Sequence, residues 1–136
     1  MELSPERTKS LAALSLEQRS LSYVPYSGFR VGAALLTKDG RVFTGCNIEN
    51  SAYSPTICAE RTAIFKAVSE GCRQFEAIFI AGGAGEEPDD YCPPCGVCRQ
   101  VMMEFCDPDF KVYLVKTPDD WQLYTLDEIL PLGFKL

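Results

Sequence analysis

Three cysteines and one glutamate constrain this chain more than any other feature of its sequence. Cys58 lies far along the chain from Cys95 and Cys98, so a fold that uses all three thiols on one metal must join two distant segments. Three protein ligands leave a tetrahedral zinc ion with one open position, which distinguishes a catalytic site from a closed structural one. Glu60 would then stand beside the metal, free to move protons rather than to bind it.

The length and composition favour one domain over residues 1–136, since 136 residues suit a single core. Hydrophobic residues make up 46% and charged residues 24% of the chain, an ordinary globular mixture. No apolar run approaches the roughly 20 residues that span a bilayer. The first residues lack the basic and apolar regions of a signal peptide. We therefore expect a cytoplasmic protein with no membrane contact, whose seven cysteines stay reduced and available for metal.

The charge balance restricts the partners. The chain has 13 Lys and Arg against 19 Asp and Glu, a net charge of −6. Nucleic-acid binding depends on neutralising phosphates, so a nucleic-acid partner is not expected. The chain contains no histidine, which removes both the usual general base and the usual zinc ligand. Any metal chemistry must therefore rest on cysteines and carboxylates.

Helical and strand patterns alternate along the chain. Ser4 and Pro5 form an N-cap signal that predicts a helix to about Ser22, burying Leu11, Leu14 and Leu21. Further helices are predicted over residues 54–70 and 96–105, and a short one opens with a capping box at residues 125–128. Strands are predicted over residues 29–37, 41–47, 76–82, 111–116 and 121–124, with a surface loop over 82–90. The alternation predicts an α/β layered domain with a mixed five-stranded sheet flanked by helices.

The first two predicted strands carry further signals. Asp39 and Gly40 between them are typical of a hairpin turn. The run from Val31 to Leu36 is apolar without alternation, which indicates a strand covered on both faces. Its small residues predict that another element packs close to it.

The predicted helix starts suit the proposed ligands. Cys58 is expected in the first turn of its helix, and Cys95 and Cys98 at the start of theirs. Free N–H groups and the helix dipole there lower the pKa of a thiol and favour the thiolate. Near a helix start, Glu60 can lean toward the same pocket as Cys58. A carboxylate there can take a proton from water and return it to a substrate.

Charge counting assigns a supporting role to Arg61. Three thiolates and Zn²⁺ sum to one excess negative charge. Arg61, beside Glu60, could offset this charge by donating hydrogen bonds to a thiolate. The alternative is an ordinary surface ion pair.

Several segments together resemble one known family. They are Tyr26-Ser27-Gly28-Phe29-Arg30-Val31-Gly32-Ala33-Ala34, Gly45-Cys46-Asn47-Ile48-Glu49-Asn50, Tyr53, Cys58-Ala59-Glu60-Arg61, Pro94-Cys95-Gly96-Val97-Cys98-Arg99-Gln100, Leu130-Pro131 and Phe134. In these segments the chain resembles the cytidine deaminases of the small, homotetrameric type with three zinc-binding cysteines. One departure is Pro93, where Ser is expected before Pro94 and Cys95.

The resemblance implies a three-layer fold, one zinc ion per chain and a function. That function is hydrolytic deamination of free cytidine and 2′-deoxycytidine to uridine and 2′-deoxyuridine with release of ammonia, as in pyrimidine salvage. Glu60 would be the catalytic acid and base. The implied substrate contacts are Asn47 and Glu49 to the ribose hydroxyls, a main-chain group of Ala59 to the pyrimidine, Phe29 at the base, and Tyr53 and Phe134 in a neighbouring subunit's site.

One physical argument supports the implied sugar contacts. Asn47 and Glu49 lie two residues apart at a strand end, so their side chains point the same way and could bind a diol together. Without the resemblance, a turn residue and a surface charge would be the preferred interpretations.

Other interpretations stay open at this point. Cys92 and Cys95, or Cys95 and Cys98, could be a redox dithiol. Cys92 could be a fourth ligand in a closed structural zinc module without enzymatic activity. Among enzymes, a blasticidin-S-type deaminase and a nucleic-acid deaminase are the rivals.

Overall fold

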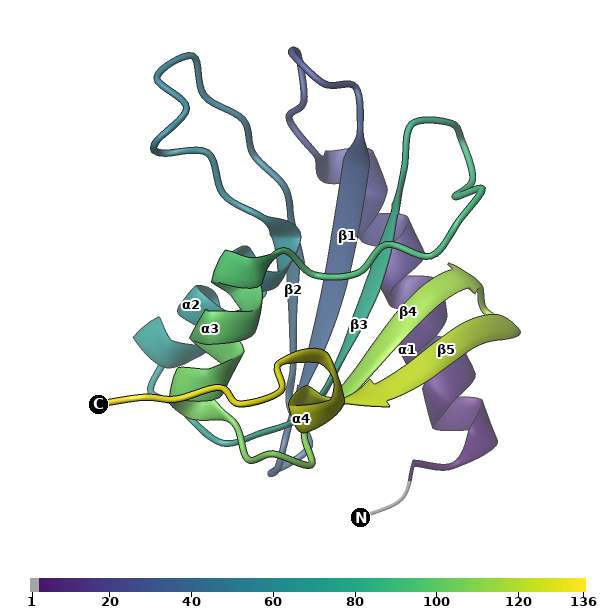
Figure 1. Cartoon of the computed structure of the whole chain (residues 1–136). Coiled ribbons are helices and arrows are strands. Elements are labelled where there is room, and N and C mark those ends of the chain that lie inside the picture. The colour runs from purple at the N-terminus through teal and green to yellow at the C-terminus, as the bar shows by residue number, and fades with distance from the viewer. Residues whose placement is uncertain (1–2) are drawn as a thin grey trace.

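A five-stranded sheet forms the middle layer of the computed structural model, which describes residues 3–136 (Figure 1). Its strands lie in the order β2-β1-β3-β4-β5. Their bounds are β1 Arg30–Thr37, β2 Val42–Cys46, β3 Phe75–Gly83, β4 Lys111–Thr117 and β5 Asp120–Thr125. Only the β3–β4 pair is parallel, so the sheet is mixed, as predicted.

Helices cover both faces of the sheet (Figure 1). Helix α1 (Pro5–Gln18) lies on one face, and α2 (Ala59–Ser69) and α3 (Gly96–Phe105) lie on the other. A short helix α4 (Leu126–Ile129) follows β5 and begins with the predicted capping box at Thr125. The predicted α/β three-layer fold is therefore confirmed. Between residues 3 and 136, none of the helices has the length and apolar character needed to span a bilayer.

Strand β1 divides the core into two parts. Val31, Ala33 and Leu35 belong to the cluster under α2 and α3. Ala34 and Leu36 belong to the cluster under α1. Seven of the eight residues of β1 are buried, which confirms a strand covered on both faces.

Two glycines allow helices to approach the sheet closely. A Cβ atom at Gly32 would lie 2.1 Å from the backbone oxygen of Ser15 in α1. A Cβ atom at Gly45 would lie 2.3 Å from the backbone oxygen of Ala59 and 2.7 Å from the backbone nitrogen of Ala63, both in α2. The close packing predicted from small residues in β1 is confirmed. The contact at Gly45 also fixes the first turn of α2.

The first helix ends earlier than predicted. Helix α1 stops at Gln18, and a short 3₁₀ helix η1 (Arg19–Leu21) follows. Leu11 is buried as predicted, but Leu21 is 66% exposed, so its predicted burial is wrong. The side chain that enters the interior is Arg19, whose guanidinium donates to the backbone oxygens of Arg30, Gly83, Gly85 and Glu86. These carbonyl groups satisfy a cation that would otherwise be costly to bury.

The second long helix begins later than predicted. The sequence pattern placed its start at residue 54, whereas α2 begins at Ala59 and Cys58 is its N-cap. Ile57 exchanges two backbone hydrogen bonds with Ile48, which keeps this segment extended. Cys58 therefore lies just outside the helix rather than in its first turn.

The close approach at Gly45 generates a stability prediction. We expect Gly45→Ala to lower the free energy of unfolding by about 2–3 kcal/mol, because the added Cβ overlaps the backbone of α2. Urea denaturation measures the change. Gly85→Ala is the matched control, since its Cβ would meet only the backbone oxygen of Glu87 at 3.5 Å; a change below about 0.5 kcal/mol is expected there. Equal effects of the two substitutions would contradict the packing argument.

Candidate active site

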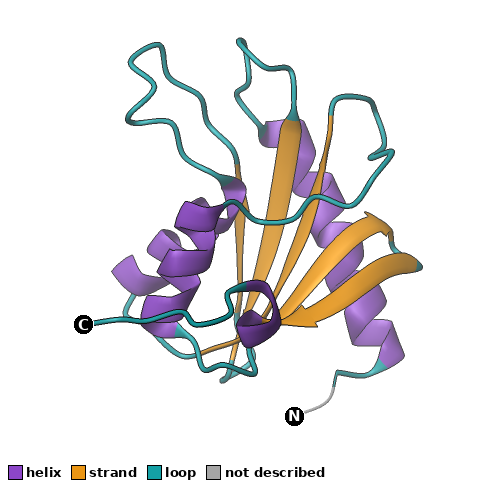
Figure 2. Cartoon of the chain, viewed as in Figure 1, coloured by secondary structure: helices purple, strands orange, loops and turns teal. Residues whose placement is uncertain are grey.

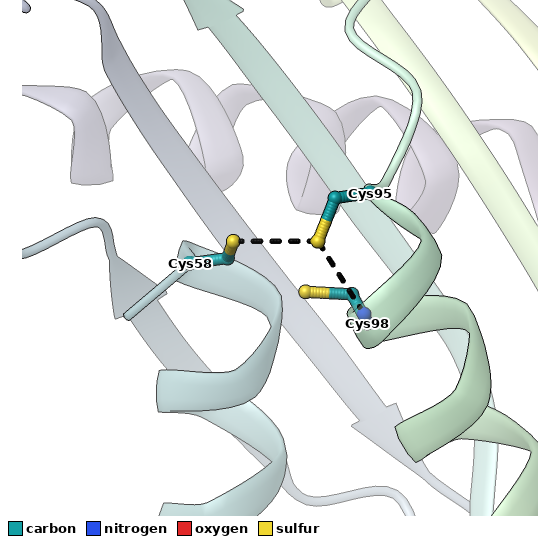
Figure 3. Close-up of side chains that lie close together, drawn as sticks. All are labelled: Cys58, Cys95 and Cys98. Carbon is teal, nitrogen blue, oxygen red and sulfur yellow. Dashed lines mark hydrogen bonds between the residues drawn. The ribbon is translucent and has the colours of Figure 1, made fainter. Parts of the chain in front are cut away.

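The starts of α2 and α3 bring the three predicted ligands together (Figure 3). Cys58 is the N-cap of α2, Cys95 is the N-cap of α3, and Cys98 lies in the first turn of α3. Their sulfur atoms all lie within 4.8 Å of one another. The sulfurs of Cys58 and Cys95 are 3.6 Å apart, and the backbone N–H of Cys98 donates to the Cys95 sulfur at 3.4 Å.

These distances fit a zinc ion. Tetrahedral coordination with Zn–S bonds of about 2.3 Å places the sulfurs about 3.8 Å apart. Among residues 3–136, no further cysteine or carboxylate joins this cluster, so three ligands leave one position open. Cys92 lies outside the cluster, which argues against a closed four-cysteine site.

The charges of the cluster also favour a cation. A hydrogen bond from the Cys98 thiol, with help from Arg61, lowers the pKa of Cys58 to about 5 despite its burial. The same contact with Cys58, together with burial, raises the pKa of Cys98. The thiolate of Cys58 is thus stabilised by the protein alone, whereas ionising Cys98 requires added positive charge. A bound zinc ion supplies that charge.

Arg61 occupies the position predicted for it. Its Nη2 donates to the Cys58 sulfur at 3.3 Å. Burial opposes the charge of this guanidinium, but its hydrogen bonds with Cys58 and Cys98 outweigh burial and raise its pKa. Its Nε is buried without a hydrogen-bond acceptor among the described residues, so one donor of the guanidinium stays unused beside the thiols. Arg61 lies against the thiols and not in a surface ion pair.

Glu60 is buried next to the cluster. Its side chain is only 3% exposed, and burial raises its pKa to about 7. Such a pKa suits a group that both accepts and donates protons near neutral pH. Because Cys58 is an extended N-cap, Glu60 lines the same cavity although the two residues are only two apart.

A cavity of about 210 Å³ opens beside the thiols. Three of the residues predicted to bind substrate, Asn47, Glu49 and Ala59, line it together with Glu60. The long loops over residues 22–29, 47–58 and 84–95 lie toward the same end of the sheet (Figure 2), and the last two contribute to the cavity lining. Five residues in the lining were not predicted to contact substrate: Val31, Thr56, Ile57, Cys92 and Pro93.

The side chains of Asn47 and Glu49 are held by the loop before β1. Asn47 donates through Nδ2 to the backbone oxygen of Phe29 at 2.8 Å and accepts at Oδ1 from the backbone N–H of Val31 at 2.9 Å. The carboxylate of Glu49 accepts from the N–H groups of Tyr26 and Ser27. Hydrogen bonds with Ser27, above all from its hydroxyl, lower the pKa of Glu49, so it is a fixed carboxylate.

Comparison with known proteins agrees with this geometry. A family model described as the cytidine and deoxycytidylate deaminase zinc-binding region matches residues 5–114. This chain belongs to the cytidine deaminase family. The family and the thiol cluster together confirm the predicted zinc cofactor.

Relatives extend the similarity over most of the chain. A cytidine deaminase of Sporosarcina psychrophila is 49% identical, covering 93% of this chain and 90% of the relative. One from Halalkalibacterium halodurans is 52% identical, with 88% of each chain covered. The crystal structure of a Burkholderia pseudomallei cytidine deaminase superposes with a TM-score of 0.83 at 42% identity, covering 92% of this chain and 97% of that one.

Three predicted aromatic contacts lie outside the cavity of this family member. The side chains of Phe29, Tyr53 and Phe134 are 41%, 80% and 69% exposed, and none of them is part of the cavity lining. Tyr53 adopts a left-handed backbone conformation with φ 61° on an exposed loop. Phe134 belongs to a C-terminal segment that crosses α3 (Figure 1), where its backbone oxygen accepts from Gln100 at 2.9 Å.

Arg99 fixes the second ligand segment of the deaminase site, a function that the sequence did not indicate. Its Nε donates to the backbone oxygen of Pro94 at 2.8 Å, and its Nη1 donates to the backbone oxygen of Ile129 at 2.7 Å. Arg99 therefore joins the residue before Cys95 to the end of α4. The sequence signals for such a contact were its place directly after Cys98 and within the segment that resembles the family.

The ligand geometry predicts which cysteines hold zinc. We expect wild-type protein to contain one zinc ion per chain and Cys58→Ser, Cys95→Ser and Cys98→Ser to lose most of it, since each removes one of three thiolates. Mass spectrometry of metals in the purified variants measures the content. Cys92→Ser is the matched control and should keep its zinc. Loss of zinc from this control would instead indicate a fourth ligand.

Proposed function

We propose that this chain catalyses the zinc-dependent hydrolytic deamination of free cytidine and 2′-deoxycytidine, giving uridine or 2′-deoxyuridine and ammonia. The observation that carries the proposal is a buried glutamate, Glu60, in one cavity with the three-thiol cluster. Membership of the cytidine deaminase family supports the same reaction.

The residues divide the chemistry among them. Cys58, Cys95 and Cys98 would hold a zinc ion, which would supply the Lewis acidity that makes water nucleophilic near neutral pH. Glu60 accepts a proton from this water and delivers it to N3 of the pyrimidine, which activates C4 for addition. Glu60 then takes the proton of the hydroxyl that has added to C4 and gives it to the 4-amino group. C4 becomes a carbonyl as the C4–N bond breaks and ammonia leaves.

The other residues hold the substrate and the ligands. Asn47 and Glu49 bind the sugar hydroxyls, and a main-chain group of Ala59 contacts the base. The predicted contact of Phe29 with the base requires its exposed ring, which lies outside the cavity lining, to turn toward the substrate. Arg61 donates a hydrogen bond to the Cys58 sulfur and offsets part of the thiolate charge, which would preserve the Lewis acidity of a zinc ion held there. The net charge of −6 supports a free nucleoside over a nucleic-acid polymer.

The proposal is tested by turnover of wild-type protein and of Glu60→Gln, followed by ultraviolet absorbance. We expect wild-type protein to deaminate cytidine and 2′-deoxycytidine. Glu60→Gln should keep its zinc and lose turnover by about 10²–10⁴-fold, because the amide cannot shuttle protons. Glu70→Gln, an exposed carboxylate at the far end of α2, is the matched control and should keep wild-type turnover.

Other outcomes of this assay distinguish the rival functions. Turnover of blasticidin S alone would indicate that type of deaminase, and turnover of a single-stranded oligonucleotide alone would indicate a nucleic-acid deaminase. A structural zinc module would show no turnover in any variant. Undiminished cytidine turnover by Glu60→Gln would show that Glu60 is not the proton carrier.

We further infer that the chain forms a homotetramer in which Tyr53 and Phe134 complete the sites of neighbouring subunits. Their exposure supports this, as does a cavity smaller than the roughly 300–1,000 Å³ of typical ligand sites. Co-expression of Glu60→Gln with Phe134→Ala should restore activity, since mixed oligomers contain complete sites. A fully active monomer in sedimentation would refute shared sites.

The remaining proposals concern the number of domains in the chain and its location in the cell. We propose that residues 1–136 act as one domain in the cytoplasm. All seven cysteines are free, and a reducing compartment would keep the three ligands available for zinc.

A further inference from the structure

The turn before β1 holds the carboxylate of Glu49 at three points. Oε1 accepts from the backbone N–H of Tyr26 at 3.0 Å and from that of Ser27 at 3.1 Å. Oε2 accepts from the hydroxyl of Ser27. Gly28, with φ 69°, allows the chain to turn here, and its N–H donates to the backbone oxygen of Val24. Of the three groups that donate to the Glu49 carboxylate, two are backbone N–H groups and one is the hydroxyl of Ser27.

The direction of the Ser27 hydroxyl hydrogen follows from its partners. The backbone N–H of Phe29 donates to the Ser27 oxygen at 3.0 Å, so this oxygen acts as an acceptor toward Phe29. The hydroxyl has a single hydrogen, and an ionised carboxylate can only accept. The hydrogen of Ser27 therefore points at Oε2 of Glu49.

After these contacts, the carboxylate of Glu49 has one lone-pair position left to accept a hydrogen bond from a further donor. A carboxylate offers about four lone-pair positions, two on each oxygen. Oε1 accepts two hydrogen bonds and Oε2 accepts one. The position still free is on Oε2, and Glu49 is half-buried and lines the cavity beside the thiols.

The same turn also reaches the second predicted sugar contact. The backbone oxygen of Phe29 accepts from Nδ2 of Asn47, and Oδ1 of Asn47 accepts from Val31. Ser27 thereby ties Glu49 to a peptide segment that also orients Asn47. A shift of this turn would misplace both side chains relative to a sugar.

We propose that Ser27 is a positioning residue that fixes Glu49 so that the free lone pair of Oε2 meets a hydroxyl of the nucleoside sugar. This inference rests on the proposed deaminase function. Removing the hydroxyl leaves Oε1 on its two backbone N–H groups but takes away the contact that fixes Oε2, which is then left to water. Because a sugar hydroxyl is bound in the ground state and the transition state alike, its loss should raise KM more than it lowers kcat.

The test compares two substrates in wild type, Ser27→Ala and Ser27→Thr. For cytidine, Ser27→Ala should lower kcat/KM about tenfold, equivalent to about 1.4 kcal/mol, almost entirely through KM. For 2′,3′-dideoxycytidine, which lacks the diol, kcat/KM should change less than about twofold. Ser27→Thr keeps a hydroxyl and should restore most of the cytidine activity.

Two controls distinguish a loss of Glu49 positioning from a general loss of protein stability. Ser69→Ala removes an exposed hydroxyl that donates to the backbone oxygen of Lys66 at the far end of α2, and should leave both substrates unaffected. Thermal unfolding and zinc content should be equal in all variants. Ser27→Cys, with a weaker donor of similar shape, gives the same comparison should the alanine variant fold poorly.

Three results would overturn the inference. They are an equal loss on both substrates, no loss on cytidine, or a loss confined to kcat. Each of these leaves the deaminase function intact, because wild-type turnover is measured in the same experiment. A wild-type protein without cytidine turnover would overturn the proposed function and this inference together.

Discussion

The convergence of two helix starts on one point is the constraint on which the rest of this structure depends. Cys58 and Cys95 each cap a helix, and Cys98 lies one turn further along the second. Thiolates within 4.8 Å of one another would repel, and a shared cation would remove that repulsion. Because one thiol comes from α2 and two come from α3, the thiols stay together only if the sheet holds the two helices at a fixed separation. Gly45 contributes by letting α2 lie directly against β2.

Three arginines hold the segments around the thiol cluster in a chain that contains no histidine. Arg61 supplies positive charge to the Cys58 sulfur. Arg99 fixes the backbone just before Cys95, and Arg19 fixes the loop after β3 through several carbonyl groups. Each guanidinium has five donors in a rigid plane, so one side chain can hold several irregular segments. The segments around the site are thus tied to the rigid layers although they contain little regular structure.

Two Ser-Pro dipeptides show that a local helix-start signal does not by itself decide where a helix begins. Ser4 and Pro5 open α1, and the Ser4 hydroxyl accepts from the backbone N–H of Arg7 at 3.1 Å. Ser54 and Pro55 look alike in sequence but open no helix, since they lie in a turn and the chain is extended at Ile57 and Cys58 before α2 begins. The pairing of Ile57 with Ile48 decides between the two outcomes. A contact with another segment thus overrides a local preference of similar strength.

The sequence alone determined the features that depend on residue type and short spacing. These include the strands, the hairpin at Asp39 and Gly40, the capping box at Thr125, the three thiol ligands and the place of Arg61. Only the tertiary structure decided that Arg19 is buried, that Phe29, Tyr53 and Phe134 lie outside the chain's own cavity, and that Ser27 holds Glu49. The physical reason is the separation along the chain of the residues that interact. Caps, turns and periodic faces form between residues a few positions apart, whereas these contacts join segments whose separation is set by the packed sheet and helices.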